Sequence, residues 1–370
     1  MVTKTNCIVP VNILEKFMGD VFIRLGVPEE EARISAEILI TSDLRGIESH
    51  GIGRLKMYYD RIRQGTQFAS TQMEIVRESP TTAVVDGHHG MGQVTGYRSM
   101  SMAIEKAKKY GMGAVAVRNS AHFGIAGYYP LMAIKAGMIG MTFTNARPSI
   151  APTFGVKPML GTNPIAFGCP TDEEFPFLFD AATSITQRGK LEVLDRLEKN
   201  APEGWVIDQA GGFLTNPGDC LDGFGKSTAA LLPLGGPGET LGGHKGYGLA
   251  TMVEILSASL QTGSFLYGLM GLDEAGQKIP NKLGHFFMAV NIEAFTSLED
   301  FQHTTGEILR ELRAATLQPG CERIYTAGEK EFEIEKRVRA NGVVVVPNLM
   351  TDVKTIITEL GMPEYEPYFS

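Results

Sequence analysis

Apolar residues recur at intervals of three and four through the first part of the chain, which is the spacing of amphipathic helices. The pattern predicts a helix over residues 11–25, a second over 28–44 and a third that begins at Ser49. The second helix opens with Pro28 and three glutamates, which suits both the fixed φ of proline and the positive end of the helix dipole. We therefore predict an α-helical unit over residues 1–75.

Beyond residue 75 the pattern changes to short apolar runs between loops rich in glycine and proline, which is typical of strands. A helix expected over residues 94–110 interrupts these runs. The strand candidates span residues 83–86, 114–118, 138–144, 164–167, 177–180 and 286–292. Because their spacing is irregular, we predict a mixed α/β fold with one mixed sheet over residues 76–329.

Three further segments follow the predicted sheet. They are a charged helix over residues 329–339, an apolar run at 343–346 and an amphipathic helix over 352–360. We expect residues 330–370 to join the N-terminal helical unit.

The composition narrows the class of protein. The 370 residues carry a net charge of -8 at pH 7, so the chain lacks the basic surface typical of proteins that bind nucleic acid or anionic membranes. No apolar run approaches the roughly 20 residues of a membrane span, and the first ten residues lack the apolar core of a signal peptide. Four scattered cysteines form neither a CxxC pair nor a disulfide-dense pattern. We expect an enzyme of small molecules in the cytoplasm.

The familiar dinucleotide-binding signature is absent. Gly111, Gly113 and Ala116 follow a predicted helix and precede a predicted strand, whereas a Rossmann fingerprint needs strand, glycine turn and helix in that order. Any cofactor domain is therefore expected to be of a different, non-Rossmann type.

Residues 234–248 form the most glycine-rich stretch of the chain and run into an apolar helix expected over 247–260. The stretch holds His244 and Lys245 next to the start of that helix. Free N–H groups at a helix N-terminus favour an anion, so this loop is a candidate for binding a pyrophosphate. A flexible surface connection is the alternative interpretation.

A polar stripe is expected on the third helix. Ser49 suits its N-cap, and His50, Arg54 and Tyr58 then follow at intervals of four, which places them on one face. Oxidation of a 2-hydroxy acid needs a base for the hydroxyl proton and a cation for the adjacent carboxylate, and histidine and arginine supply these two groups. The alternative is an exposed amphipathic helix with a chance histidine.

His122 is a second acid/base candidate, because it comes directly after the predicted strand at 114–118, where loops often present site residues. A histidine that is only solvated or hydrogen-bonded is the alternative. The histidines of the chain show no i, i+4 pair and no nearby carboxylate spacing of the familiar zinc sites, so we expect no metal.

Five motifs together resemble one family. They are SHGIGR at residues 49–54, NSAHFG at 119–124, LGTNPIAFG at 160–168, FDAATS at 179–184 and HKGYGL at 244–249. They occur in the same order as in the type-2 malate/L-lactate dehydrogenases, and the resemblance continues to AGEKE at 327–331. It thus covers nearly the whole chain.

The resemblance implies an enzyme that uses NAD or NADP, with a mixed-sheet cofactor domain, a helical domain and an active site completed in a homodimer. By the same resemblance, His50 and His122 flank the reacting carbon, Arg54 holds the C1 carboxylate and Tyr58 borders the pocket. The positions that match the family's cofactor contacts are Phe179, Asp180, Ala181, Ala182, His244, Lys245, Gly328 and Glu329.

Members of the family act on malate, lactate, sulfolactate, ureidoglycolate, a diketogulonate or a cyclic imino acid. The substrate must therefore be inferred from residues in which this sequence differs from its relatives. Relatives often carry a hydroxyl residue in place of Ala146 and a residue other than arginine in place of Arg147. If Arg147 faces the pocket, it can pair with a second substrate carboxylate, as in (S)-malate; otherwise it is an ordinary surface arginine. A binding protein that keeps the scaffold without turnover is the alternative from another class.

Overall fold

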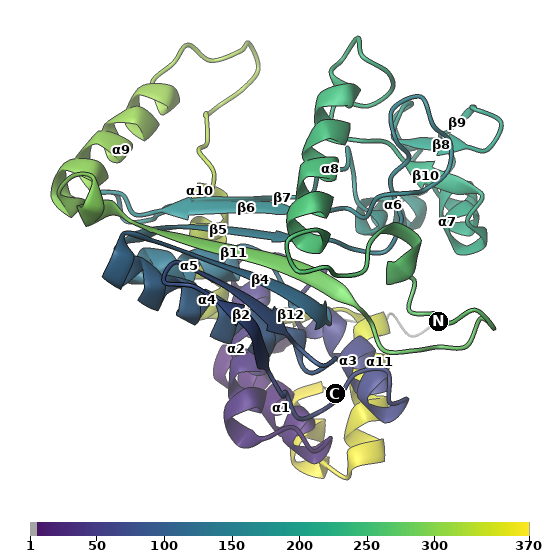
Figure 1. Cartoon of the computed structure of the whole chain (residues 1–370). Helices are drawn as coiled ribbons and strands as arrows, with labels where there is room; N and C mark the ends of the chain where they lie inside the picture. The colour runs from purple at the N-terminus through teal and green to yellow at the C-terminus, as the bar shows by residue number, and fades with distance from the viewer. Residues whose placement is uncertain (1–5, 370) are drawn as a thin grey trace.

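The structure is a computed structural model and describes residues 6–369. A seven-stranded sheet lies at its centre (Figure 1). From edge to edge its strands are β2 (Glu74–Glu78), β3 (Thr82–Asp86), β4 (Met112–Ser120), β11 (Leu283–Asn291), β5 (Met138–Thr144), β6 (Ile165–Cys169) and β7 (Phe177–Ala181). Only β3 and β4 pair in parallel, and every other neighbouring pair is antiparallel. The predicted mixed α/β fold of non-Rossmann type is confirmed.

Helices cover the two faces of this sheet. In Figure 1, α4 (Gly92–Tyr110) and α5 (Tyr128–Lys135) lie beneath it, and α8 (Gly243–Ala258) stands above it. Two charged helices, α9 (Leu298–Arg313) and α10 (Glu329–Asn341), follow in the chain after β11. Burial of sheet side chains on both faces matches the apolar runs that predicted the strands.

The first and last parts of the chain pack together. The N-terminal helices are α1 (Val11–Arg24), α2 (Glu29–Leu44), the 3-10 turn η1 (Ile52–Arg54) and α3 (Leu55–Arg63); the C-terminal ones are α11 (Pro347–Leu360) and η4 (Pro363–Phe369). β1 (Cys7–Val9) pairs antiparallel with β12 (Val343–Val345), and the Phe17 ring lies 5.0 Å from that of Tyr365 and 5.1 Å from that of Phe369. One apolar core joins these helices to α4 and the sheet.

A smaller unit has a separate apolar core, which includes Ile150, Leu191 and Val206. Its elements are α6 (Arg188–Arg196), β8 (Val206–Asp208), β9 (Phe213–Leu214), α7 (Pro217–Lys226) and β10 (Ala229–Leu231). The three strands form their own sheet in the order β10-β8-β9. Within residues 6–369, no helix is long and apolar enough to cross a membrane.

The predicted start of the third helix is wrong. Ser49 does not cap it: its hydroxyl lies 2.8 Å from Nδ1 of His50, and the helical turns begin only at Ile52. The cap comes instead from α2, where the Asp43 carboxyl accepts the Ile52 N–H at 2.8 Å. His50 therefore lies in the turn before the helix and not on its polar stripe. The helix predicted from Tyr247 also begins earlier, at Gly243.

Candidate active site

Two segments that are distant in sequence contact each other at His122. It follows β4, and its Nδ1 lies 2.6 Å from the hydroxyl of Tyr58 on α3. The ring of His50, from the turn before α3, stacks on His122 with 5.4 Å between the ring centroids and 27° between the ring planes. The structure thus brings together His50, Tyr58 and His122, although His50 reaches the site from a turn and not from the predicted stripe.

Close backbone packing holds the segment around His122. A Cβ at Gly92 would collide with the carbonyl oxygens of Ala121 and His122, and Gly124 has a φ of +84°, which favours glycine. The Phe123 ring stacks on that of His285 from β11 at 4.4 Å and 7°. His122 therefore rests on rigid neighbours at the end of a central strand.

Burial controls the charge of both histidines. It lowers the pKa of His50 to about 4, with a smaller contribution from the positive charge of Arg54. It also lowers the pKa of His122 well below the usual value, with contributions from His50 and Arg54 in that order. Both side chains keep part of their surface open to solvent. They are therefore neutral at pH 7 and able to accept a proton from a small molecule that enters.

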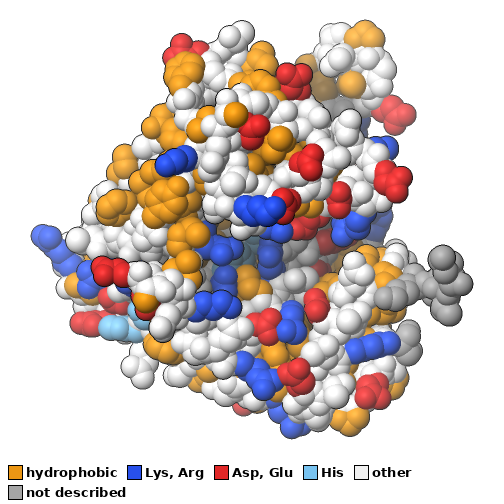
Figure 2. Space-filling model, turned by 90° about the vertical axis from the view of Figure 1, so that its right-hand side faces the viewer, with side chains coloured by type: hydrophobic (Ala, Val, Ile, Leu, Met, Phe, Trp, Pro, Cys, Tyr) orange, Lys and Arg blue, Asp and Glu red, His pale blue; other side chains and the backbone are white. Residues whose placement is uncertain are grey.

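Arg54 lies next to this pair, whereas Arg147 belongs to the loop after β5. The Nε of Arg54 donates to the Ser49 carbonyl at 2.6 Å, which ties its side chain to the turn that carries His50. Arg147 is exposed in the loop after β5, where the amide oxygen of Asn163 accepts the Ala146 N–H at 3.2 Å. Figure 2 shows a hollow between the part that carries α8 and the helical part below, with lysine and arginine side chains along it.

Two residues of this region escaped the sequence analysis. Arg61 lies on α3 three residues after Tyr58, and its positive charge contributes to the lowered pKa of His122. The regular spacing from Arg54 through Tyr58 is the signal that could have found it. His285 is fully buried on β11 and packs against Phe123, and nothing in its sequence surroundings marks it.

The cofactor candidates gather around the end of β7. Phe179, Asp180 and Ala181 close that strand, and Ala182 follows it. One oxygen of the Asp180 carboxylate accepts the Gly127 N–H at 2.7 Å, while Phe179 and Asp180 both remain exposed to solvent. This edge of the sheet offers a carboxylate and an aromatic face to a ligand.

The glycine-rich loop lies beside the same edge. The Leu234 N–H donates to the Thr183 carbonyl at 2.8 Å, just beyond β7. A Cβ at Gly243 would collide with the Gly236 carbonyl oxygen, so glycine lets the loop close on itself before α8 begins. His244 and Lys245 are exposed in the first turn of α8, although the His244 N–H already donates to Gly238. The loop therefore exposes the side chains of His244 and Lys245 to a ligand, while some of its backbone N–H groups are already used in hydrogen bonds within the loop.

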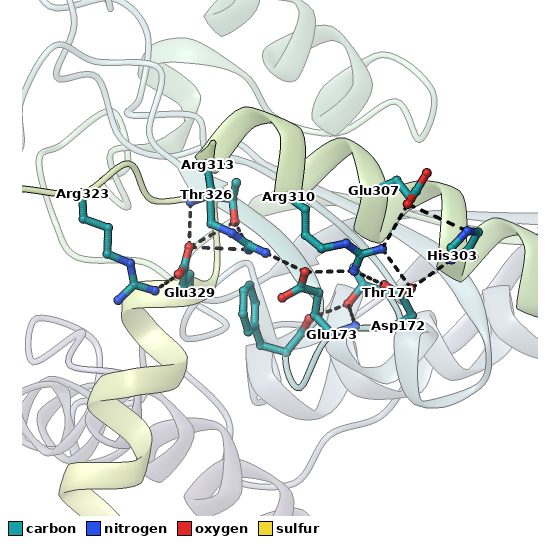
Figure 3. A network of polar contacts seen from close by, with 11 residues as sticks. Thr171, Asp172, Glu173, His303, Glu307, Arg310, Arg313, Arg323, Thr326 and Glu329 are labelled. Carbon is teal, nitrogen blue, oxygen red and sulfur yellow. Dashed lines mark hydrogen bonds and ion pairs between the residues drawn. The ribbon is translucent and has the colours of Figure 1, made fainter. Parts of the chain in front are cut away.

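Gly328 and Glu329 lie against β7 but differ in their contacts: Gly328 lies beside the strand, whereas the Glu329 carboxylate is paired with other charged side chains. The Leu178 N–H donates to the Ala327 carbonyl at 3.2 Å, which places Gly328 beside the strand. Figure 3 shows the Glu329 carboxylate inside a network of charged side chains, where it bonds Arg323 and accepts the Thr326 N–H at 3.0 Å. Arg313 on α9 pairs with the same carboxylate at 3.8 Å. The Glu329 side chain thus joins α9 to α10.

No group of three or more histidine, cysteine or acidic side chains within the described part of the chain could hold a metal ion. The histidines of the site instead contact Tyr58, Ser49 and one another.

The comparisons with known proteins agree on one family. The family model described as malate/L-lactate dehydrogenase matches residues 9–354. A malate dehydrogenase of Pyrococcus horikoshii is 45% identical over 96% of this chain and 96% of its own, and an L-sulfolactate dehydrogenase of Methanocaldococcus jannaschii is 40% identical over 94% and 96%. The crystal structure of malate dehydrogenase from Entamoeba histolytica superposes with a TM-score of 0.93 at 44% identity, covering 97% of this chain and 99% of that one. The chain therefore belongs to the malate/L-lactate dehydrogenase family.

Substitution of Asp43 tests how the turn with His50 is held. Burial raises the pKa of Asp43 to about 8, so the group is a neutral acid at pH 7. Asp43→Asn keeps an oxygen for the Ile52 N–H and is expected to leave stability and turnover close to the wild type. Asp43→Ala leaves that N–H unpaired, so we expect a loss of about 1–3 kcal/mol in urea unfolding, with reduced turnover. Equal behaviour of the two variants would show that this hydrogen bond is not what positions the turn.

Proposed function

We propose that this protein is a dehydrogenase that interconverts (S)-malate and oxaloacetate with NAD or NADP. The observation that carries the proposal is the pair of neutral, stacked histidines next to arginines that can hold carboxylates. Membership of the malate/L-lactate dehydrogenase family supports it, as does the 45% identity to the malate dehydrogenase of Pyrococcus horikoshii. The catalytic groups match the needs of hydride and proton removal from a 2-hydroxy acid.

Two arginines are proposed to hold the substrate. Arg54 binds the C1 carboxylate next to the reacting carbon, because its side chain is fixed to the turn that carries His50. Arg147 binds the second carboxylate from the loop after β5. A planar guanidinium forms two parallel hydrogen bonds with a carboxylate, which fixes the orientation of the substrate as well as its position.

His122 is proposed as the base that takes the hydroxyl proton. His122 Nδ1 accepts the Gly124 N–H at 3.3 Å and lies 2.6 Å from the Tyr58 hydroxyl. Action as a base at Nε2 requires the other tautomer, in which Nδ1–H donates to Tyr58 and the Gly124 N–H turns from Nδ1 to the Tyr58 oxygen, which it also neighbours. Burial keeps the ring neutral before the reaction, and His50 stacks on it and orients the substrate oxygen or shares the proton. Tyr58 thus acts by setting the tautomer and the direction of the imidazole.

The residues at the end of β7 fit a nicotinamide dinucleotide. The second oxygen of Asp180 can accept hydrogen bonds from a ribose, and Lys245 and His244 offer positive charge or N–H donors to a pyrophosphate. Phe179, Ala181, Ala182, Gly328 and Glu329 are proposed to line the same groove. When bound, the nicotinamide supplies or accepts the hydride at C2 of the substrate. Assays with both dinucleotides decide which one is used.

Sulfolactate is the second candidate substrate. Its sulfonate gives it two negative charges, like malate, so the same pair of arginines suits it. The relative from Methanocaldococcus jannaschii is named L-sulfolactate dehydrogenase at 40% identity. A substrate with one carboxylate, such as lactate, would leave Arg147 without a role.

A homodimer is proposed for the working enzyme. One side of α8 packs on the sheet, whereas Leu249, Met252 and Ile255 on its other side are exposed. Apolar side chains gathered on one helix face favour burial against a second copy. A monomer mass in sedimentation velocity at micromolar concentration would contradict this. The expected location in the cytoplasm can be checked by cell fractionation.

Removal of Arg147 tests the binding of the second carboxylate. We expect purified protein to oxidise NADH or NADPH faster with oxaloacetate than with pyruvate or 2-oxoglutarate. Arg147→Ala should raise the KM for oxaloacetate roughly 10-fold or more, as expected for the loss of a charge-assisted hydrogen bond, and should leave the KM for pyruvate nearly unchanged. A higher rate with pyruvate than with oxaloacetate in the wild type would show that the protein is a dehydrogenase but that malate is not its substrate.

The pH dependence of malate oxidation tests the role of the histidines. A base acts in its unprotonated form, and the pKa of His122 is lowered below 6.5, so kcat/KM should stay constant through pH 7 and fall only below pH 6.5. In Arg54→Gln this acid limb should move to higher pH, because a positive charge that disfavours the imidazolium is gone. An acid limb centred above pH 6.5 in the wild type would rule out His122 as the base.

A further inference from the structure

Arg61 faces the same side of α3 as the groups of the proposed active site. Arg54, Tyr58 and Arg61 follow at intervals of four and three, which places their side chains along one face of the helix. The Tyr58 hydroxyl at the middle of this row reaches His122. The backbone of Arg61 is held as well, because its carbonyl accepts the N–H groups of Thr66 and Gln67 beyond the end of the helix.

The guanidinium of Arg61 has no anionic partner among residues 6–369. Its Nη1 is buried without a hydrogen bond, and Arg61 takes part in none of the ion pairs between described residues. Burial lowers its pKa, Tyr58 opposes that effect, and the positive charges of Arg147 and Arg54 lower the pKa further. The guanidinium of Arg61 is thus repelled by those of Arg54 and Arg147, so its surroundings favour a ligand with more than one negative charge.

Arg63 shows what an arginine of this helix does when its role is structural. It lies two residues further on and is exposed, and its guanidinium bonds both the Tyr59 hydroxyl and the Glu359 carboxylate. The contrast within one helix sets Arg61 apart. A buried cation without a partner is costly, whereas the same group with a bound carboxylate is compensated.

We propose that Arg61 is a specificity-determining residue that binds the second anionic group of the substrate from the inside of the cleft, opposite the exposed Arg147. The proposal rests on the proposed function, because it assigns a role to Arg61 in the selection of the dicarboxylate. In this arrangement Arg61 contacts the anionic group through its buried Nη1, and Arg147 contacts the same group from the exposed loop after β5.

The test compares Arg61→Gln and Arg61→Lys with the wild type on oxaloacetate and on pyruvate. We expect Arg61→Gln to lose roughly 10- to 100-fold in kcat/KM for oxaloacetate through a higher KM, while kcat/KM for pyruvate changes by less than about threefold. Arg61→Lys should recover part of the loss, because it restores the charge without the planar fork. Arg63→Gln is the matched control and should leave both substrates unaffected.

Binding without turnover gives a second readout. The affinity for hydroxymalonate, measured by calorimetric titration with NADH or NADPH bound, should fall in Arg61→Gln by the same factor as kcat/KM for oxaloacetate. The affinity for glycolate should not fall. Equal losses for both substrates, or no loss for oxaloacetate, would overturn the role of Arg61 while leaving malate dehydrogenase activity intact. Failure of the proposed function would look different, because the wild type itself would then prefer pyruvate.

Discussion

The hydrogen bond between the Tyr58 hydroxyl and His122 Nδ1 is the contact on which the proposed active site depends. It joins α3 of the helical part to the end of β4 at 2.6 Å, across 64 positions of sequence. Because Tyr58 is fully buried, the bond holds only if the apolar core between the helices and the sheet is packed as observed. The apolar core fixes the position of the Tyr58 ring, and the Tyr58 hydroxyl in turn fixes the orientation of the His122 imidazole.

The charge states of the groups around His50 and His122 depend on that packing. Burial keeps His50 and His122 neutral, and the arginines that surround them make the imidazolium form less favourable still. A dianionic substrate changes this balance, because its carboxylates compensate the arginines and raise the proton affinity of the neighbouring base. Binding the correct substrate and preparing the histidine for its proton are then parts of one interaction.

Local pattern predicted the elements whose periodicity is strong. The helices at residues 11–24 and 29–44 and the strand at 138–144 lie where expected, within two residues at each end. The central place of β11, between β4 and β5, could not be predicted, because its pairing joins segments more than 130 residues apart. The turn at His50 was wrongly predicted because its cap is Asp43, a tertiary contact from α2. Helical spacing could have identified Arg61, whereas the charged network of Glu329 depends on a tertiary ion pair between Arg313 of α9 and Glu329 of α10.

The most direct test of the account follows the transferred hydrogen itself. Purified protein would be incubated with oxaloacetate and with NADH or NADPH that carries deuterium at both C4 positions of the nicotinamide, and the malate formed would be analysed by mass spectrometry and chiral chromatography. The account predicts (S)-malate with one deuterium at C2. Malate without deuterium, or no malate from either dinucleotide, would contradict hydride transfer to oxaloacetate as the reaction of this site.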